Sequence, residues 1–153
     1  MTERIRPADI PQGLYSAMGD VEAYLKTLPF DPGLLELVRL RAAQLNGCAY
    51  CVEMHHLEAA AAGESEQRLY ALCVWKETPF FSDKERALLA WTEKVTLLAD
   101  NEISDELMAQ MQQHFSQKEI ANLTLAIAQT NSWNRLGKTF GMAPGRYKVG
   151  MHG

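Results

Sequence analysis

The sequence has few cysteines, no long apolar run and no excess of positive charge, and each shortage excludes a class of protein. Three cysteines are too few, and odd in number, for a disulfide-stapled secreted domain. No stretch approaches the ~18 consecutive apolar residues of a membrane-spanning helix. With 15 basic and 19 acidic side chains the net charge is -4, which gives no field to attract nucleic acid or anionic lipid. We therefore expect neither a nucleic-acid nor a membrane partner.

The amino terminus also lacks the apolar core of a secretory signal. Residues 1–13, MTERIRPADIPQG, carry charges and prolines instead. We expect a soluble cytoplasmic protein, in which a C-x-x-C spacing indicates metal binding or redox chemistry rather than a structural disulfide. A length of 153 residues with 47% hydrophobic content favours one globular domain over residues 1–153.

Helical periodicity runs through the chain, and no β-type alternation interrupts it. Ser82 with Glu85, and Ser116 with Glu119, form capping boxes that mark two helix starts. The predicted fold is all-α, a compact bundle of about seven helices over residues 16–28, 32–46, 48–62, 65–77, 82–98, 104–115 and 116–140. The final segment, GMAPGRYKVGMHG, is predicted to be a loose tail or a packing arm.

The segment QLNGCAYCVEMHH concentrates the reactive side chains, because Cys48, Cys51 and His55 share one face of the helix predicted over 48–62. Both cysteines lie in its first turn, where the helix dipole favours a thiolate and where the pair can close a disulfide. His55 is one turn beyond Cys51 and is placed to accept or return a proton. The pattern indicates a redox pair with its own proton handler.

Glu36 interrupts the apolar stripe of the helix predicted over 32–46. A buried carboxylate is costly unless it is paired or protonated, so a raised pKa would suit Glu36 to a proton relay toward the thiols. Only Asn46 and Gly47 separate this helix from the next, and a helical hairpin would bring Glu36 near the cysteines. Taken alone, Glu36 could equally form an ordinary ion pair with Arg39 at i+3.

The segment ELVRLRAAQLNGCAYCVEMHHLEAAAAGESEQRLYAL resembles the core of the AhpD-like alkylhydroperoxidases of the carboxymuconolactone decarboxylase superfamily. In that family a Glu precedes the first Cys by twelve residues, the cysteines form C-x-x-C, and a His follows the second Cys by four. Glu36, Cys48, Cys51 and His55 match at all four places. The similarity extends through ETPFFSDKERALLAWTEKVTLL and NLTLAIAQTNSWNRLG, and so covers most of the chain.

The resemblance implies an oligomeric peroxidase, a homotrimer or homohexamer, with its redox core at about residues 31–98. Its cysteine pair would reduce a hydroperoxide and would be re-reduced by a dithiol donor, lipoyl- or thioredoxin-like. We expect no cofactor and no resident metal. Tyr50 stands where the best-known members carry a relay His; its phenol is neutral up to a pKa near 10, so the relay is shorter here or Tyr50 shapes the pocket.

We expect Cys51, beside His55, to attack an organic hydroperoxide or hydrogen peroxide and become a sulfenic acid. Cys48, nearer the helix tip and expected to be the more exposed, would condense with it to a disulfide. The donor would then attack the Cys48 sulfur. His55 and Glu36 would move the protons.

Other interpretations of the same residues stay open. A zinc site could use Cys48, Cys51 and His55, but it lacks a fourth ligand because His56 faces elsewhere. The thiols could be incidental core residues. The chain could also be a thiol-disulfide redox adapter without a peroxide step, or a non-redox decarboxylase-like member of the superfamily.

The remaining cysteine and the aromatic residues are given structural roles. Cys73, beside Leu69 and Leu72, is expected to be a buried apolar thiol. Trp75, Trp91 and Trp133 are expected in the core or at an interface. The sequence assigns no role to the three histidines other than His55, which are His56, His114 and His152.

Overall fold

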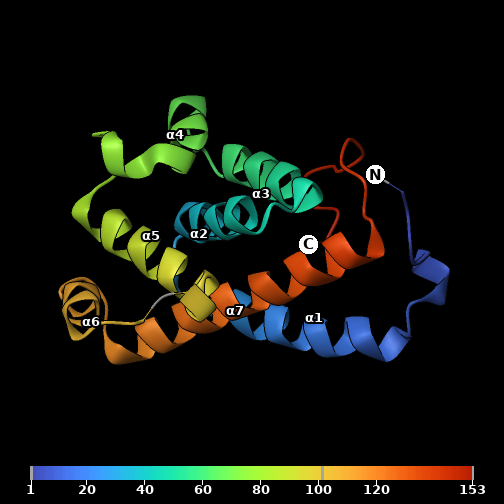
Figure 1. Ribbon diagram of the computed structural model, residues 1–153, viewed down its shortest axis with the longest axis horizontal. Helices are drawn as coiled ribbons and strands as arrows, with labels where there is room; N and C mark the ends of the chain where they lie inside the picture. The colour runs from blue at the N-terminus through green and yellow to red at the C-terminus, as the bar shows by residue number, and fades with distance from the viewer. Residues whose placement is uncertain (1, 101, 153) are drawn as a thin grey trace.

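The computed structural model describes residues 2–100 and 102–152, and helices are the only regular secondary structure within this range (Figure 1). The described residues contain seven α-helices: α1 (Gln12–Lys26), α2 (Pro32–Asn46), α3 (Ala49–Ala61), α4 (Glu66–Ala71), α5 (Asp83–Thr96), α6 (Asp105–Gln112) and α7 (Gln117–Phe140). Three short 3₁₀ helices accompany them: Pro7–Asp9, Leu72–Glu77 and Leu98–Asp100. The predicted all-α class is confirmed.

A tight turn joins α2 to α3 and fixes the position of the cysteine segment. Gly47 adopts the left-handed conformation with φ 62°, which glycine reaches without a Cβ clash. The chain then reverses, and the backbone N–H of Cys48 donates to the carbonyl of Ala43 at 3.1 Å. Cys48 is the N-cap of α3, so the predicted helical hairpin and the predicted position of the cysteines at a helix start are confirmed.

The capping boxes at Ser82 and Ser116 are both present, as the sequence predicts. The helix predicted over 65–77 is wrong in its second half, where α4 gives way to the 3₁₀ helix Leu72–Glu77 with a non-helical Val74 at φ -122°. The guanidinium of Arg86 donates to three backbone carbonyls at the end of this segment, which offsets the lost helical hydrogen bonds.

Several other helix boundaries differ from the prediction, among them the end of α5 at Thr96 rather than at residue 98. The first helix begins at Gln12 rather than at residue 16, with Pro11 at its N-cap position, and it ends at Lys26 rather than at residue 28. Helix α6 ends at Gln112 rather than at residue 115, because the chain turns there before the capping box at Ser116 opens α7. Such shifts leave the bundle unchanged.

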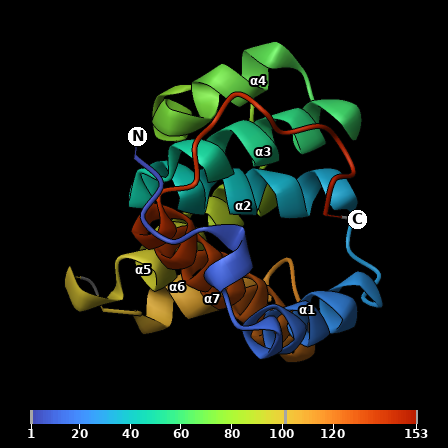
Figure 2. The same cartoon turned by 90° about the vertical axis from the view of Figure 1, so that its right-hand side faces the viewer.

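Helix α2 lies at the centre of the bundle and contacts α3, α5 and α7. Figure 2 shows α3 and α4 on one side of α2, with α1, α5, α6 and α7 on the other. Each side has its own apolar cluster: Val38, Leu88 and Ile127 belong to one, and Leu40 and Leu72 to the other. The residues of α2 are buried on both sides for this reason, which matches its nearly all-round apolar sequence.

The segment after α7 is a packing arm. It returns from the end of α7 across α3, where Tyr147 is buried (Figure 2). Among the described helices, none combines the length and the apolar character that a membrane crossing requires.

Candidate active site

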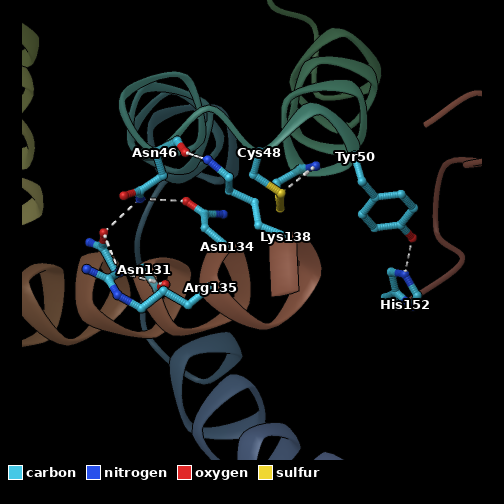
Figure 3. The surroundings of a disulfide bond; sticks show 9 residues. Asn46, Cys48, Tyr50, Asn131, Asn134, Arg135, Lys138 and His152 are labelled. Carbon is cyan, nitrogen blue, oxygen red and sulfur yellow. Dashed lines mark hydrogen bonds between the residues drawn. A yellow bond between two sulfur atoms is a disulfide. The ribbon is translucent and has the colours of Figure 1, made fainter. Parts of the chain in front are cut away.

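A disulfide joins Cys48 to Cys51 at the start of α3 (Figure 3). The Cys48 sulfur also accepts a hydrogen bond from the backbone N–H of Cys51 at 3.4 Å, as an N-cap side chain does. Gly137 of α7 lies against the pair: a Cβ at this position would be 3.5 Å from the Cys48 sulfur and 3.6 Å from the Cys51 sulfur. The disulfide is therefore held between the tip of α3 and the side of α7.

The expectation that Cys48 is the more exposed cysteine is wrong. Cys48 is 1% exposed and Cys51 3% exposed, because the turn that carries Cys48 packs against Ala43 and α7. The two sulfurs differ in another respect, since Cys51 lines the large cavity described below and Cys48 does not. Of the two sulfur-bearing residues, Cys51 is therefore the one that faces the cavity.

The structure brings Glu36 and His55 together. Nδ1 of His55 lies 2.8 Å from Oε2 of Glu36, and both side chains are buried. The other carboxylate oxygen of Glu36 accepts a hydrogen bond of 2.7 Å from Arg39. The relay partner and the i+3 ion pair were alternatives in the sequence, and the two oxygens of one carboxylate accommodate both.

The expectation of a raised pKa for Glu36 is wrong. Burial by itself would raise it, but the hydrogen bond and charge of His55, together with those of Arg39, outweigh the burial and lower the pKa of Glu36. Glu36 is therefore a carboxylate at neutral pH. In that state it accepts the Nδ1 proton of His55 and leaves Nε2 of the ring free to take up a proton.

The Glu36 pair continues into a network that the sequence did not reveal. Arg39 also reaches Glu22 of α1 at 3.3 Å, and the indole N–H of Trp133 on α7 donates to the same carboxylate at 2.9 Å. Three helices thus fix the orientation of His55 through Glu36. Trp133 and Glu22 are 111 residues apart, and no local pattern in the sequence links them.

A cavity of about 710 Å³ unites four of the five predicted site residues. Glu36, Tyr50, Cys51 and His55 all line it, and Cys48 lies behind Cys51. Much of the remaining wall is apolar or aromatic, and includes Tyr15, Met54, Trp133, Leu136, Phe140 and Met142. Such a cavity suits a small organic molecule presented to a sulfur and an imidazole.

Tyr50 has a partner that the sequence did not predict. Its hydroxyl lies 2.7 Å from Nε2 of His152, in hydrogen-bond contact (Figure 3). Burial, followed by the charge of Glu53, raises the pKa of Tyr50, so its phenol stays neutral. Tyr50 and His152 both line the cavity. No role is predicted for His152, because its segment has no periodicity from which its position could be inferred.

The packing arm closes one side of the cavity. The Tyr147 hydroxyl donates to the carboxylate of Glu58 on α3, and the backbone N–H of Gly150 donates to the same carboxylate at 2.7 Å. The backbone N–H of Gly145 is held by Glu53 at 2.7 Å. Burial and the hydrogen bond to Glu58 raise the pKa of Tyr147, which keeps this donor protonated.

Two other predictions concern the cysteines. Within the described residues, no group of three or more Cys, His, Asp and Glu side chains is arranged to hold a metal ion. Cys73 is exposed, so the prediction of a buried thiol is wrong. It rested on a regular α-helix through residue 77, and the 3₁₀ segment turns Cys73 away from the core.

The remaining aromatic and histidine residues lie as follows. Trp75 and Trp91 are buried in the core as expected. His56 faces away from the cavity and approaches Glu66 at 3.4 Å.

Comparisons with known proteins place this geometry in a family. Residues 12–94 match the Carboxymuconolactone decarboxylase family. The chain is 37% identical over 142 residues to the uncharacterized protein YdfG of Bacillus subtilis, a match that covers 92% of this chain and 96% of that protein. It is 31% identical over 106 residues to the uncharacterized protein YnjA of Escherichia coli, covering 69% of this chain and 58% of YnjA.

Solved structures share the fold. A protein of unknown function from Agrobacterium tumefaciens, described as a candidate AhpD antioxidant defence protein, superposes with a TM-score of 0.91 at 34% identity, covering 95% of this chain and 100% of that one. A peroxidase-related protein from Ralstonia eutropha with an alkylhydroperoxidase AhpD core gives 0.77 at 19% identity, covering 88% and 72%. The debrominase Bmp8 gives 0.79 at 16% identity, covering 88% and 72%. The last two show the fold alone.

Proposed function

The chain belongs to the carboxymuconolactone decarboxylase family, and from this premise we propose that it is a thiol-dependent peroxidase whose substrate is an organic hydroperoxide or hydrogen peroxide. The observation that carries the proposal is one cavity lined by Cys51 and by a Glu36-oriented His55. A disulfide partner for Cys51 lies directly behind it. The Agrobacterium structure with 34% identity, described as a candidate AhpD antioxidant defence protein, supports the proposal.

In the proposed reaction the Cys51 thiolate attacks one peroxide oxygen and the O–O bond breaks. The departing alkoxide takes a proton and leaves as the alcohol, and Cys51 becomes a sulfenic acid. Cys48 then attacks the Cys51 sulfur, water leaves, and the disulfide forms. His55 supplies and accepts the protons at Nε2, since its Nδ1 is occupied by Glu36. Tyr50 shapes the cavity wall.

A dithiol donor, lipoyl- or thioredoxin-like, completes the cycle. Its first thiolate attacks one sulfur of the disulfide, and its second thiol displaces the resulting mixed disulfide, so the donor leaves oxidised and both cysteines are reduced. Because Cys51 lines the cavity and Cys48 does not, we propose Cys51 as the sulfur attacked, in place of the sequence-based choice of Cys48.

We further propose that residues 1–153 form a single domain, with the redox core at about residues 31–98. We propose that this domain works in the cytoplasm as a homotrimer or homohexamer.

The test is peroxide consumption with dithiothreitol or dihydrolipoamide as donor, alongside a count of free thiols before and after peroxide. We expect turnover that disappears in Cys51→Ser and in Cys48→Ser, with a sulfenic acid trapped only in Cys48→Ser. Disulfide exchange without peroxide consumption would identify a redox adapter instead. Catalysis that survives the loss of both thiols would identify a decarboxylase-like member of the family.

A further inference from the structure

Asn134 of α7 is a fully buried amide with an unused donor. Its side chain is 0% exposed, and within the described chain its Nδ2 is the buried side-chain polar atom that has no hydrogen-bond partner. Buried polar groups are nearly always paired, because an unpaired one costs stability without return. An unpaired donor such as Asn134 Nδ2 can therefore form its hydrogen bond in another state of the protein, in which the disulfide is open.

The surrounding amides fix which way this donor points. The Nδ2 of Asn131 donates to the hydroxyl of Thr96 and to the carbonyl of Ile127, so its Oδ1 must face Asn46. The Nδ2 of Asn46 therefore donates, and it does so to both Asn131 Oδ1 and Asn134 Oδ1 at 2.8 Å. Since the oxygen of Asn134 is held by Asn46, its N–H₂ group is directed to the opposite side.

That opposite side carries the disulfide. In the view of Figure 3 the amide nitrogen of Asn134 points to the side on which Lys138 and Cys48 lie. Gly137, one turn further along α7, is the residue whose Cβ position lies 3.5 Å from the Cys48 sulfur. Asn134 and Gly137 thus occupy the same face of α7, beneath the tip of α3.

From this placement we propose that Asn134 Nδ2–H is the hydrogen-bond donor that receives the Cys48 sulfur as a thiolate whenever the disulfide opens. The inference rests on the thiol-disulfide cycle proposed above. When a donor thiolate attacks the Cys51 sulfur, a new S–S bond forms, the Cys48–Cys51 bond breaks, and its electron pair stays on Cys48. The negative charge then develops in a buried place that only fixed dipoles can stabilise.

The backbone N–H of Cys51 acts in the same direction as Asn134. The Cys51 backbone N–H already points at the Cys48 sulfur, at the positive end of α3. Three charged groups lie nearby. Lys138 Nζ donates to the Asn46 carbonyl at 2.7 Å, and Arg135 donates to the Asn131 carbonyl at 2.9 Å. The Glu36 pair with His55 lies on the cavity side with Cys51. Asn134 is thus the side-chain donor assigned to Cys48, as His55 is the proton carrier assigned to Cys51.

The same donor serves the oxidative half of the cycle. A Cys48 held as a thiolate is the nucleophile that must attack the Cys51 sulfenic acid, and a thiol would have to lose its proton first. Loss of Asn134 is therefore expected to slow disulfide formation and disulfide opening together.

The experiment titrates Cys48 in a Cys51→Ser, Cys73→Ser background, where it is the sole thiol, by the ultraviolet absorbance of the thiolate. Adding Asn134→Ala should raise the pKa of the Cys48 thiol by about 1 to 2. At a pH below that pKa, the fraction of Cys48 present as thiolate should then fall by about tenfold or more. Asn131→Ala is the matched control: it removes an equal hydrogen bond from Asn46 but no donor facing the sulfur, and it should leave that pKa within about 0.3.

A measurement without a variant at Asn134 covers the case in which Asn134→Ala does not fold. In the same sole-thiol background, the side-chain N–H₂ resonance of Asn134 should shift with pH at the midpoint of the thiolate titration, while that of Asn131 should not. Equal pKa values in the two alanine variants, or an Asn134 resonance that ignores the ionisation of Cys48, would overturn the proposal. Neither result depends on peroxidase activity, so failure of the peroxide assay stays distinguishable.

Discussion

Nδ1 of His55 lies 2.8 Å from Oε2 of Glu36, and this contact connects the central helix of the bundle to the helix that carries the cysteines. It assigns one ring nitrogen to a structural hydrogen bond and leaves the other for chemistry. The carboxylate is in turn held by Arg39, so the imidazole is oriented by an ion pair rather than by loop contacts. In the proposed reaction Glu36 therefore orients His55, and His55 carries the proton.

Glu36→Gln should lower kcat/KM for peroxide by about 10²-fold or more, because the amide no longer stabilises a protonated His55. The substitution keeps the side-chain size and one hydrogen-bond acceptor. Glu22→Gln is the control, since Glu22 binds Arg39 and Trp133 but does not touch His55, and its effect should stay under about tenfold. Equal losses in both variants would mean that the network only supports the fold, and an unchanged kcat/KM for peroxide in Glu36→Gln would show that turnover does not need the contact between Glu36 and His55.

The lowered pKa of Glu36 predicts a specific loss of stability in acid. In the unfolded chain this carboxyl takes up its proton near its ordinary pKa of 4.5, whereas in the folded protein it stays ionised to lower pH. The unfolded state therefore binds more protons in this window, and the free energy of unfolding falls as the pH drops from about 4.5 through the folded pKa.

Urea unfolding of the oxidised protein at a series of pH values checks this expectation. The wild type should lose stability below about pH 4.5 more steeply than Glu36→Gln, which has no proton to take up at this position. Above that pH the stabilising contribution of the carboxylate is fully present, and the difference between the two proteins should be constant. Parallel acid slopes would show that Glu36 is not the group whose pKa is lowered.

The parts of the fold that the sequence predicts are those fixed by local signals. Asp31 caps α2 through Leu34, and Gly47 ends it, as the residue types require. The contact between Glu36 and His55 was also within reach, because a two-residue turn leaves a helical hairpin as the simplest packing. Local rules and one short connection are enough to place most of the candidate site.

The parts that failed depend on packing between distant elements. The lowered pKa of Glu36 requires Arg39 and His55 to reach it at the same time, and periodicity alone cannot weigh them against burial. Trp133 meets Glu22 only because α7 lies along α1, a relationship with no local signature. His152 belongs to an arm without helical period, so its contact with Tyr50 follows from the course of the whole chain.

Cys73 provides a direct check of the 3₁₀ segment after α4. Its thiol is exposed and donates only to the Tyr70 carbonyl at 3.4 Å, whereas the other two cysteines are buried and paired. In the native oxidised protein, one thiol per chain should therefore react with a disulfide reagent. After reduction and unfolding, three should react. In Cys73→Ser the first value should fall to zero. If Cys73 does not react in the native protein, its thiol is buried, and a continuous helix through residue 77 would be favoured.

Gly137 tests how closely α7 approaches the disulfide. A Cβ at this position would meet the two sulfurs at 3.5 and 3.6 Å and the Met142 sulfur at 3.6 Å, which are ordinary contact distances. Gly137→Ala should therefore keep the gain of about 0.5–1 kcal/mol that alanine brings to a helix interior. Gly137→Val adds methyl groups with no room left for them and should cost about 1–3 kcal/mol by overpacking.

Gly19 of α1 is the control for this pair, because a Cβ there meets nothing within 4 Å and Gly19→Ala reports the helical gain alone. The three variants are compared by urea unfolding of the oxidised proteins. If Gly137→Ala matches Gly19→Ala while Gly137→Val is destabilised, α7 supports the disulfide at van der Waals distance, as the proposal for Asn134 requires. If Gly137→Val is as stable as Gly137→Ala, the gap between α7 and the tip of α3 is wider than these distances indicate. Helix α7 then does not support the two sulfurs.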